Sequence, residues 1–103
     1  MRRAALTGIA VLALFGAFAV AYAAGEVQAG KAKALLCAAC HGRDGAGVAP
    51  NPALAGDSEE QFVKALKAYK SGERANAVMR PWARLLSDQD MSNLGAYYAS
   101  LKK

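Results

Sequence analysis

The chain has 103 residues, a formal net charge of +5 and an apolar fraction of 54%. The apolar residues are unevenly spread, because 18 of the first 23 residues are apolar, whereas the other 80 hold 38, of which 17 are alanine. A domain of this size with so few large apolar side chains is marginally stable unless something else holds it together. The length therefore excludes two separately folded domains and a large enzyme scaffold.

The N-terminal segment, residues 1–23, has the features of a secretory signal peptide. Two arginines precede an uncharged apolar run, and the sequence Ala-Tyr-Ala closes it, which predicts cleavage between Ala23 and Ala24. The alternative is an uncleaved membrane anchor, since about 20 uncharged residues can span a bilayer. Either interpretation places the remaining domain, residues 24–103, outside the cytoplasm, and we expect a periplasmic protein.

The charges of the domain that follows are scattered. Residues 24–103 hold 11 Lys and Arg against 8 Asp and Glu, a formal charge of +3. Nucleic-acid binding would need a clustered basic stripe, which is absent from this sequence. A mildly positive surface instead suits association with an acidic protein partner.

Three helical stretches without an alternating strand pattern predict an all-α fold. The first runs from about Glu26 to Cys37. The second follows Asp57-Ser58, either of which can cap it, and ends at Ser71-Gly72. The third begins at Ser87, which forms a capping box with the acidic residue three positions later, and it carries an apolar stripe made of Met91, Leu94, Tyr98 and Leu101.

Two further features concern how these helices are joined and packed. Gly30 in the first helix and Gly95 in the third lack side chains, which predicts close approach of two helix backbones. Residues 41–56 and 73–86 are long segments without a regular pattern, which is unusual in so small a domain unless a bound group orders them.

A single motif carries the chemistry. Cys37-Ala-Ala-Cys-His41 has the spacing of a haem c attachment site, in which two thiols form thioethers and the histidine binds iron. A redox disulfide is the first alternative, but it normally accompanies a strand–helix–strand pattern. A zinc site is the second, but it needs four ligands and the sequence offers only three here. We favour haem.

The sixth iron ligand has several candidates. The only histidine is already used, which leaves Met79, Met91, a lysine or no ligand. Met79 lies in the segment between the second and third helices, and Pro81 disfavours helical geometry in Arg80, so we expect an extended segment that is free to cross the haem face. Met91 lies on the apolar stripe of the third helix, where packing in the core is expected. The sequence favours Met79.

The exported domain resembles the class I cytochromes c, and most closely the small bacterial carriers of the c-four and c-five kind. The residues that carry the resemblance are Cys37 to Gly42, Asp44-Gly45, Leu54-Ala55-Gly56, Lys70 to Gly72, Met79, and Leu86 to Asp90. The resemblance implies a class I cytochrome c fold with crossed first and last helices around one covalently bound haem c. It also implies that His41 and Met79 are the axial ligands.

Two further residues bear on the surroundings of the haem. A backbone carbonyl after the motif usually accepts the second N–H of the proximal histidine, and Pro50 is our candidate, with Val48 as the alternative. Trp82 stands where similar proteins often have a second methionine. We expect its ring either to contact the haem edge or a propionate, or simply to pack in the core.

Histidine and thioether ligation would fill both axial positions, which disfavours oxygen and peroxide chemistry and leaves electron exchange. We therefore expect a monomeric single-electron carrier, not an enzyme, that meets redox complexes such as an oxidase or a dehydrogenase transiently. One alternative is a haem subunit of a larger complex. Another is a peroxide- or gas-binding haem protein, if Met79 is not a ligand.

Overall fold

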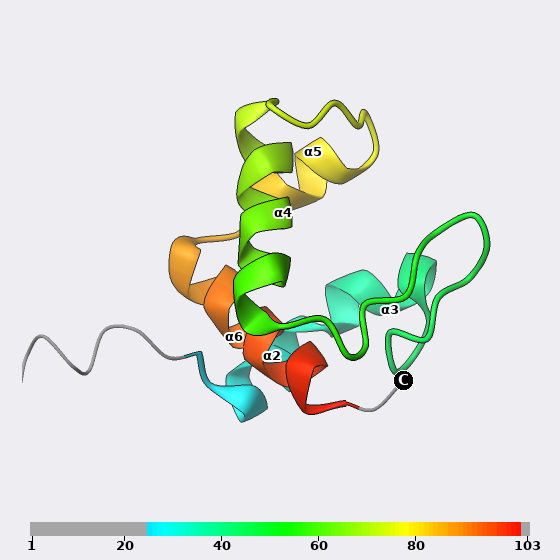
Figure 1. Cartoon of the computed structure of the whole chain (residues 1–103), viewed down its shortest axis with the longest axis vertical. Coiled ribbons are helices and arrows are strands. Elements are labelled where there is room, and N and C mark those ends of the chain that lie inside the picture. The colour runs from blue at the N-terminus through cyan, green and yellow to red at the C-terminus, as the bar shows by residue number, and fades with distance from the viewer. Residues whose placement is uncertain (1–24, 102–103) are drawn as a thin grey trace, which may run out of the picture.

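The computed structural model describes residues 25–101, which form five helices (Figure 1). The helices are α2 (Val27–Lys33), α3 (Leu35–His41), α4 (Glu59–Ser71), α5 (Met79–Arg84) and α6 (Asp88–Ser100). The only strand-like feature among residues 25–101 is an isolated bridge between Val48 and Asn51. The predicted all-α fold is confirmed. The predicted signal peptide lies outside the described residues, and none of the described helices is long and apolar enough to cross a membrane.

The first and last helices cross, as predicted. In Figure 1, α2 and α6 lie at the foot of α4, and α5 lies beside its other end. A Cβ atom on Gly30 would overlap with the backbone carbonyl of Asn93 and would lie 2.8 Å from Cβ of Tyr97. A Cβ atom on Gly95 would lie 3.1 Å from the backbone carbonyl oxygen of Glu59 in α4. Both glycines therefore permit close backbone approach, Gly30 to α6 and Gly95 to α4.

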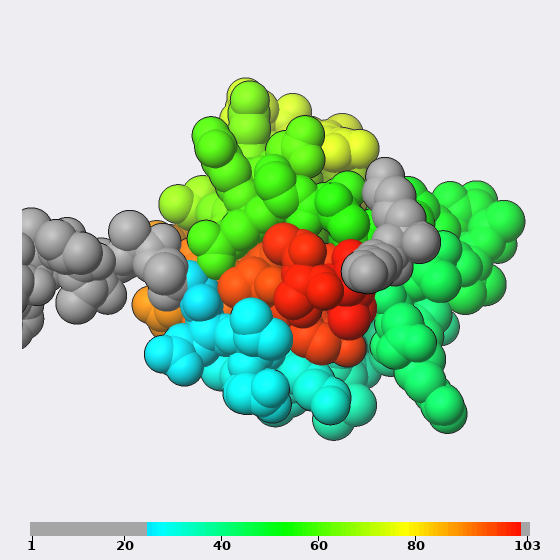
Figure 2. All heavy atoms as spheres, turned by 60° about the horizontal axis from the view of Figure 1, so that its bottom comes forward, coloured from blue at the N-terminus to red at the C-terminus, as the bar shows by residue number. Residues whose placement is uncertain are grey.

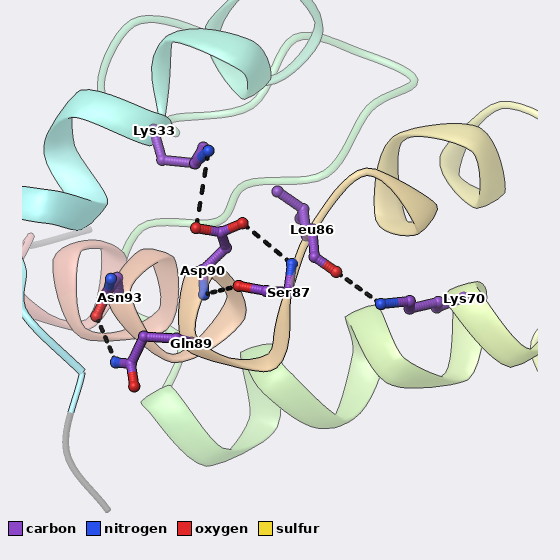
Figure 3. Close-up of polar contacts among 7 residues, drawn as sticks. All are labelled: Lys33, Lys70, Leu86, Ser87, Gln89, Asp90 and Asn93. Atoms are coloured by element: carbon purple, nitrogen blue, oxygen red, sulfur yellow. Dashed lines mark hydrogen bonds and ion pairs between the residues drawn. The ribbon is translucent and has the colours of Figure 1, made fainter. Parts of the chain in front are cut away.

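Local hydrogen bonds fix the N-terminal ends of the two longest helices, α4 and α6. The Ser58 hydroxyl accepts the N–H of Gln61 (3.1 Å), and the Gln61 side chain accepts the N–H of Ser58 (3.3 Å) at the start of α4. At the start of α6, Ser87 and Asp90 make the same reciprocal pair at 3.0 Å in each direction (Figure 3). Such boxes satisfy N–H groups that have no partner within the helix.

Two further contacts in Figure 3 connect these helices to their neighbours. The ammonium group of Lys33, at the end of α2, lies 3.7 Å from a carboxylate oxygen of Asp90 in α6. The ammonium group of Lys70, in the last turn of α4, donates to the carbonyl oxygen of Leu86 at 2.7 Å. The second contact positions the chain between α5 and α6 against the end of α4.

The hydrophobic core lies where α2, α4 and α6 meet. Met91, Leu94 and Tyr98 are fully buried, and the Tyr98 ring packs against Phe62 of α4 with ring centroids 5.4 Å apart. The expected core position of Met91 is confirmed, because its side chain has no exposed surface. Burying each such side chain contributes roughly 1.5–3 kcal/mol.

Two expectations about local structure are wrong. The first helix divides at Ala34, because the N–H groups of both Cys37 and Ala38 bond to the Ala34 carbonyl oxygen and tighten the chain there into a turn. The segment around Met79 is helical instead of extended. Pro81 is the third residue of α5, where its missing N–H costs nothing, because the first N–H groups of any helix lack partners within it.

Candidate haem site

The three residues of the motif occupy one short helix. Cys37, Cys40 and His41 lie in α3 at spacings of three and four residues, so they share one face of the helix. Cys37 is half-buried and packs against the core, Cys40 is exposed, and His41 is 7% exposed. Burial raises the pKa of the Cys37 thiol. The partly buried surroundings of Cys37 therefore disfavour its charged thiolate form.

The imidazole of His41 is oriented by a backbone carbonyl, but not by the one predicted. Its Nδ1–H donates to the carbonyl oxygen of Pro52 at 2.7 Å. The prediction of Pro50, and that of Val48, is therefore wrong. The reason is a tight turn in which Val48 and Asn51 exchange backbone hydrogen bonds of 2.7 and 3.2 Å, so Pro50 lies at the tip of the turn and Pro52 reaches the ring.

Other bonds fix this loop onto α3. The side-chain amide of Asn51 donates to the carbonyl oxygen of Cys40 at 2.8 Å, and the N–H of Gly47 donates to the carbonyl oxygen of His41 at 2.8 Å. In a neutral imidazole that donates its Nδ1–H to the Pro52 carbonyl, the lone pair lies on Nε2. A second partner of this kind is what normally holds a metal-binding histidine in position.

Met79, the candidate second ligand, lies on a different element. It is the first residue of α5, half-buried and packed against the core. The Asn76 side-chain oxygen accepts the N–H groups of both Met79 (2.9 Å) and Val78 (3.0 Å), which fixes the first turn of α5. The helix α3 packs against α2, and α5 packs against α4, without a contact between α3 and α5. His41 and Met79 are thus held by separate scaffolds (Figure 1).

Trp82 does not pack in the core. It lies one turn after Met79 in α5, and 44% of its surface is exposed. The interpretation of Trp82 as a simple core residue is therefore wrong. Residues three apart in a helix share a face, so the indole ring lies on the side of α5 that carries Met79.

Sequence reasoning missed two polar groups at the site besides Pro52. Asn51 lies in a turn whose register was not predictable, and Tyr98 was predicted only as an apolar stripe residue. The Tyr98 hydroxyl is buried without a hydrogen-bond partner in the described part of the chain, and burial raises the pKa of its phenol. An unpartnered buried hydroxyl is unusual in a finished core. Its position beside Cys37, together with the free Nε2 of His41, fits a site that binds a large apolar group with a metal ion.

The two alternatives for the motif find less support. Cys37 and Cys40 are both free cysteines and form no disulfide among residues 25–101. No three side chains of His, Cys, Asp or Glu in that range are arranged as ligands of one metal ion. A tetrahedral zinc site would need four donors, so the donor set here does not fit it.

Comparison with known proteins decides between these possibilities. The family model for Cytochrome c matches residues 27–102. The chain belongs to the cytochrome c family. Its fold is the class I cytochrome c fold, and it carries covalently bound haem c with iron, as members of this family do.

Some of the similar cytochromes are longer than this chain, and others are similar to it in length. Cytochrome c4 of Pseudomonas aeruginosa is 43% identical over 95 residues, which are 91% of this chain and 47% of that protein. Cytochrome c-554(548) of Halomonas halodenitrificans is 44% identical over 81 residues, which are 75% of this chain and 98% of that protein. The crystal structure of reduced recombinant cytochrome c4 from Pseudomonas stutzeri matches with a TM-score of 0.72 and 38% identity, over 77% of this chain and 47% of that one. The chain thus spans about half the length of the cytochrome c4 relatives it matches.

Proposed function

We propose that this chain is an exported single-electron carrier whose haem is attached through Cys37 and Cys40 and whose iron is bound by His41 and Met79. The observation that carries the proposal is the orientation of His41, because its Nδ1–H is held by the Pro52 carbonyl at 2.7 Å and Nε2 is left for iron. Cys37 and Cys40 lie one turn apart on the same helix, which suits two thioether bonds to one porphyrin edge.

Met79 is the proposed ligand on the other side. Its backbone is fixed by Asn76, and its half-buried side chain lies at the margin of the core. Met91 is unsuitable as the ligand, because its side chain is fully buried in the core. A soft, neutral thioether favours reduced iron and raises the reduction potential relative to a second imidazole.

Bound haem supplies an iron that takes up and releases one electron. The protein contributes two fixed ligands, so little has to move between the oxidation states. His41 is 7% exposed, and its hydrogen bond to Pro52 keeps the ring from rotating or changing its tautomer. With His41 and Met79 both holding the iron, small molecules such as peroxide would have no place to bind. Transfer would occur across the haem edge near Ala38, Ala39, Met79 and Arg80, during short encounters with redox proteins.

The axial assignment is tested by Met79→Leu, with Met91→Leu as the matched control. Met79→Leu should abolish the sulfur–iron band in the far-red spectrum of the oxidised protein, lower the reduction potential and permit carbon monoxide to bind. Met91→Leu conserves core volume and should leave all three unchanged. If the unaltered holoprotein lacks the band and binds carbon monoxide rapidly, it is a gas- or peroxide-binding protein instead.

Export and assembly are tested separately. We propose a periplasmic location because residues 1–23 have the composition of a signal peptide. N-terminal sequencing of the mature protein should give Ala24 as the first residue, whereas an intact N-terminus would indicate a membrane-anchored carrier. Gel filtration should give a monomer, and purification only within an assembly would indicate a haem subunit.

A further inference from the structure

One polar side chain of the described part of the protein lacks the hydrogen bond that its burial demands. The hydroxyl oxygen of Tyr98 is buried without a partner, and it is the only side-chain nitrogen or oxygen atom among residues 25–101 of which this is true. The residue has no exposed surface, so bulk water does not reach the hydroxyl. Native proteins normally supply a partner for such a group.

The ring of Tyr98 is fixed by packing on several sides. Figure 2 shows α6 (red), which carries it, lying between α2 (cyan) and α4 (light green). The ring centroid lies 5.4 Å from that of Phe62 and 5.1 Å from that of Tyr97. A Cβ atom on Gly45 would lie 2.6 Å from Cε1 of the ring, and the N–H of Gly56 donates to the backbone carbonyl of Tyr98 at 3.0 Å. The loop after the motif therefore covers the ring and holds it in place.

The first cysteine of the motif is a neighbour of this hydroxyl. Cys37 packs against the core cluster that contains Tyr98. Burial raises the pKa of the Tyr98 phenol, and the nearby Cys37 raises it further, so the hydroxyl keeps its proton at neutral pH and is able to donate. While Cys37 is a free thiol, no hydrogen bond joins the two groups. The hydroxyl is thus a donor without an acceptor beside a residue that binds the haem.

Attachment of the haem changes what the Cys37 sulfur can do. A thiol has an S–H group of its own, whereas the sulfur of a thioether has no hydrogen and is only an acceptor. A haem propionate is a less suitable partner for the hydroxyl. The side chains that surround Tyr98, which include Phe62, Tyr97 and Cys37, are uncharged, and they would leave a buried carboxylate without a cation.

We propose that the Tyr98 hydroxyl donates a hydrogen bond to the Cys37 sulfur once that sulfur has formed its thioether, and that this bond positions the attached edge of the haem and raises its reduction potential. The proposal rests on attachment through Cys37, which is part of the proposed function. Reduction adds one negative charge to the haem, and the positive end of the O–H dipole points toward the sulfur, so the dipole favours the reduced state. The dipole acts strongly here because the surroundings are buried and their dielectric constant is low.

The first test compares Tyr98→Phe with Tyr97→Phe in the holoprotein. Each variant removes one hydroxyl and retains the ring, and the two residues are adjacent in α6. Tyr98→Phe should lower the equilibrium constant for reduction about threefold, which corresponds to ~28 mV for one electron. Tyr97→Phe should leave the potential unchanged, because its hydroxyl is not a buried group without a partner. The far-red band and the intact mass should stay the same in both variants.

Proton NMR of the unaltered, reduced holoprotein tests the same bond without a substitution. The Tyr98 hydroxyl proton should exchange slowly with water and show a nuclear Overhauser contact with the β protons of Cys37. An unchanged potential in Tyr98→Phe, or an equal shift in Tyr97→Phe, would overturn the proposal. A hydroxyl proton that exchanges rapidly, or that contacts a haem propionate instead, would also overturn it. Each of these results would leave the proposed function intact, because the far-red band and the intact mass report on it separately.

Discussion

The core and the haem side of the molecule differ in how much of their apolar surface the polypeptide itself buries. In the core, where α2, α4 and α6 meet, Met91, Leu94 and Tyr98 are fully buried. On the haem side, formed by α3, residues 42–57 and α5, Val48 is 52% exposed and Trp82 is 44% exposed. The core holds the fold together by close packing, whereas the haem side holds individual side chains by hydrogen bonds. Substitutions in the two regions should therefore separate effects on the free energy of unfolding from effects on the geometry of the iron ligands.

The largest effect is expected when the haem attachment is removed. Cys37→Ser combined with Cys40→Ser should give a chain without covalent haem and lower the free energy of unfolding by about 4 kcal/mol, as loss of a tightly bound group does. Intact mass and denaturant unfolding measure these changes. Hydrogen exchange should become faster in α3 and α5 than in α4 and α6, and equal acceleration throughout would contradict the distinction between the two regions.

The next largest effect should come from the crossing of α2 and α6. Gly30→Ala adds a methyl group where the Asn93 carbonyl already lies, so we expect a loss of about 2 kcal/mol in the free energy of unfolding. The far-red band and the reduction potential should stay the same, because the haem side is not touched. Ala29→Gly, at an exposed position of the same helix, should cost about 1 kcal/mol through helix propensity alone.

A smaller effect should distinguish two helix caps of similar strength. Asn76→Ala and Ser58→Ala each remove a side-chain acceptor of helix N–H groups, and each should cost about 1 kcal/mol. Only Asn76→Ala should also weaken the proposed bond between Met79 and iron, so the far-red band of this variant should disappear at a lower temperature. If both variants lose the band together, α5 does not position Met79 independently.

The smallest effect concerns acid stability. The Ser87 backbone N–H, the largest influence, lowers the pKa of Asp90, and Lys33 contributes to the same shift. Because the pKa is lower in the folded state, this stabilisation is present above the unfolded value of about 3.9 and is lost as the pH falls through the folded value. Asp90→Asn should lower the free energy of unfolding by about 0.5 kcal/mol at neutral pH. The two denaturation midpoints should converge in acid.

Local signals in the sequence predicted the starts of α4 and α6 correctly. Ser58 and Ser87 cap helices because each bonds to an N–H only three residues away, so nothing distant in the fold is needed. The motif Cys37, Cys40 and His41 could also be recognised from the sequence, since its three residues lie within one and a half turns of α3. The stripe of α6 also follows from helical spacing, and Leu94 and Tyr98 are buried as it predicted.

Features that depend on loop register were not predictable in the same way. Pro52 reaches His41 because Gly45 and Gly47 adopt φ values of 65° and 93°, which turn the chain before the Val48–Asn51 bridge. Glycine permits such values but does not impose them. The choice between the two interpretations of Trp82 could not be made from the sequence for a related reason: its exposure depends on how α5 packs against α4, and spacing along the helix does not contain that information.

The crossing of α2 and α6 also sets an order of events when the protein is made. The N–H of Glu26 donates to the Asn93 side chain at 2.8 Å, across 67 positions of the chain, and the N–H of Gly25 donates to Glu59 at 2.9 Å. Because Asn93 lies in α6, the first helix lacks this partner until the last helix has formed. Contacts so distant in sequence slow closure of the fold. We therefore expect Cys37 and Cys40 to stay accessible until α2 and α6 have packed together, so that haem attachment can precede this step.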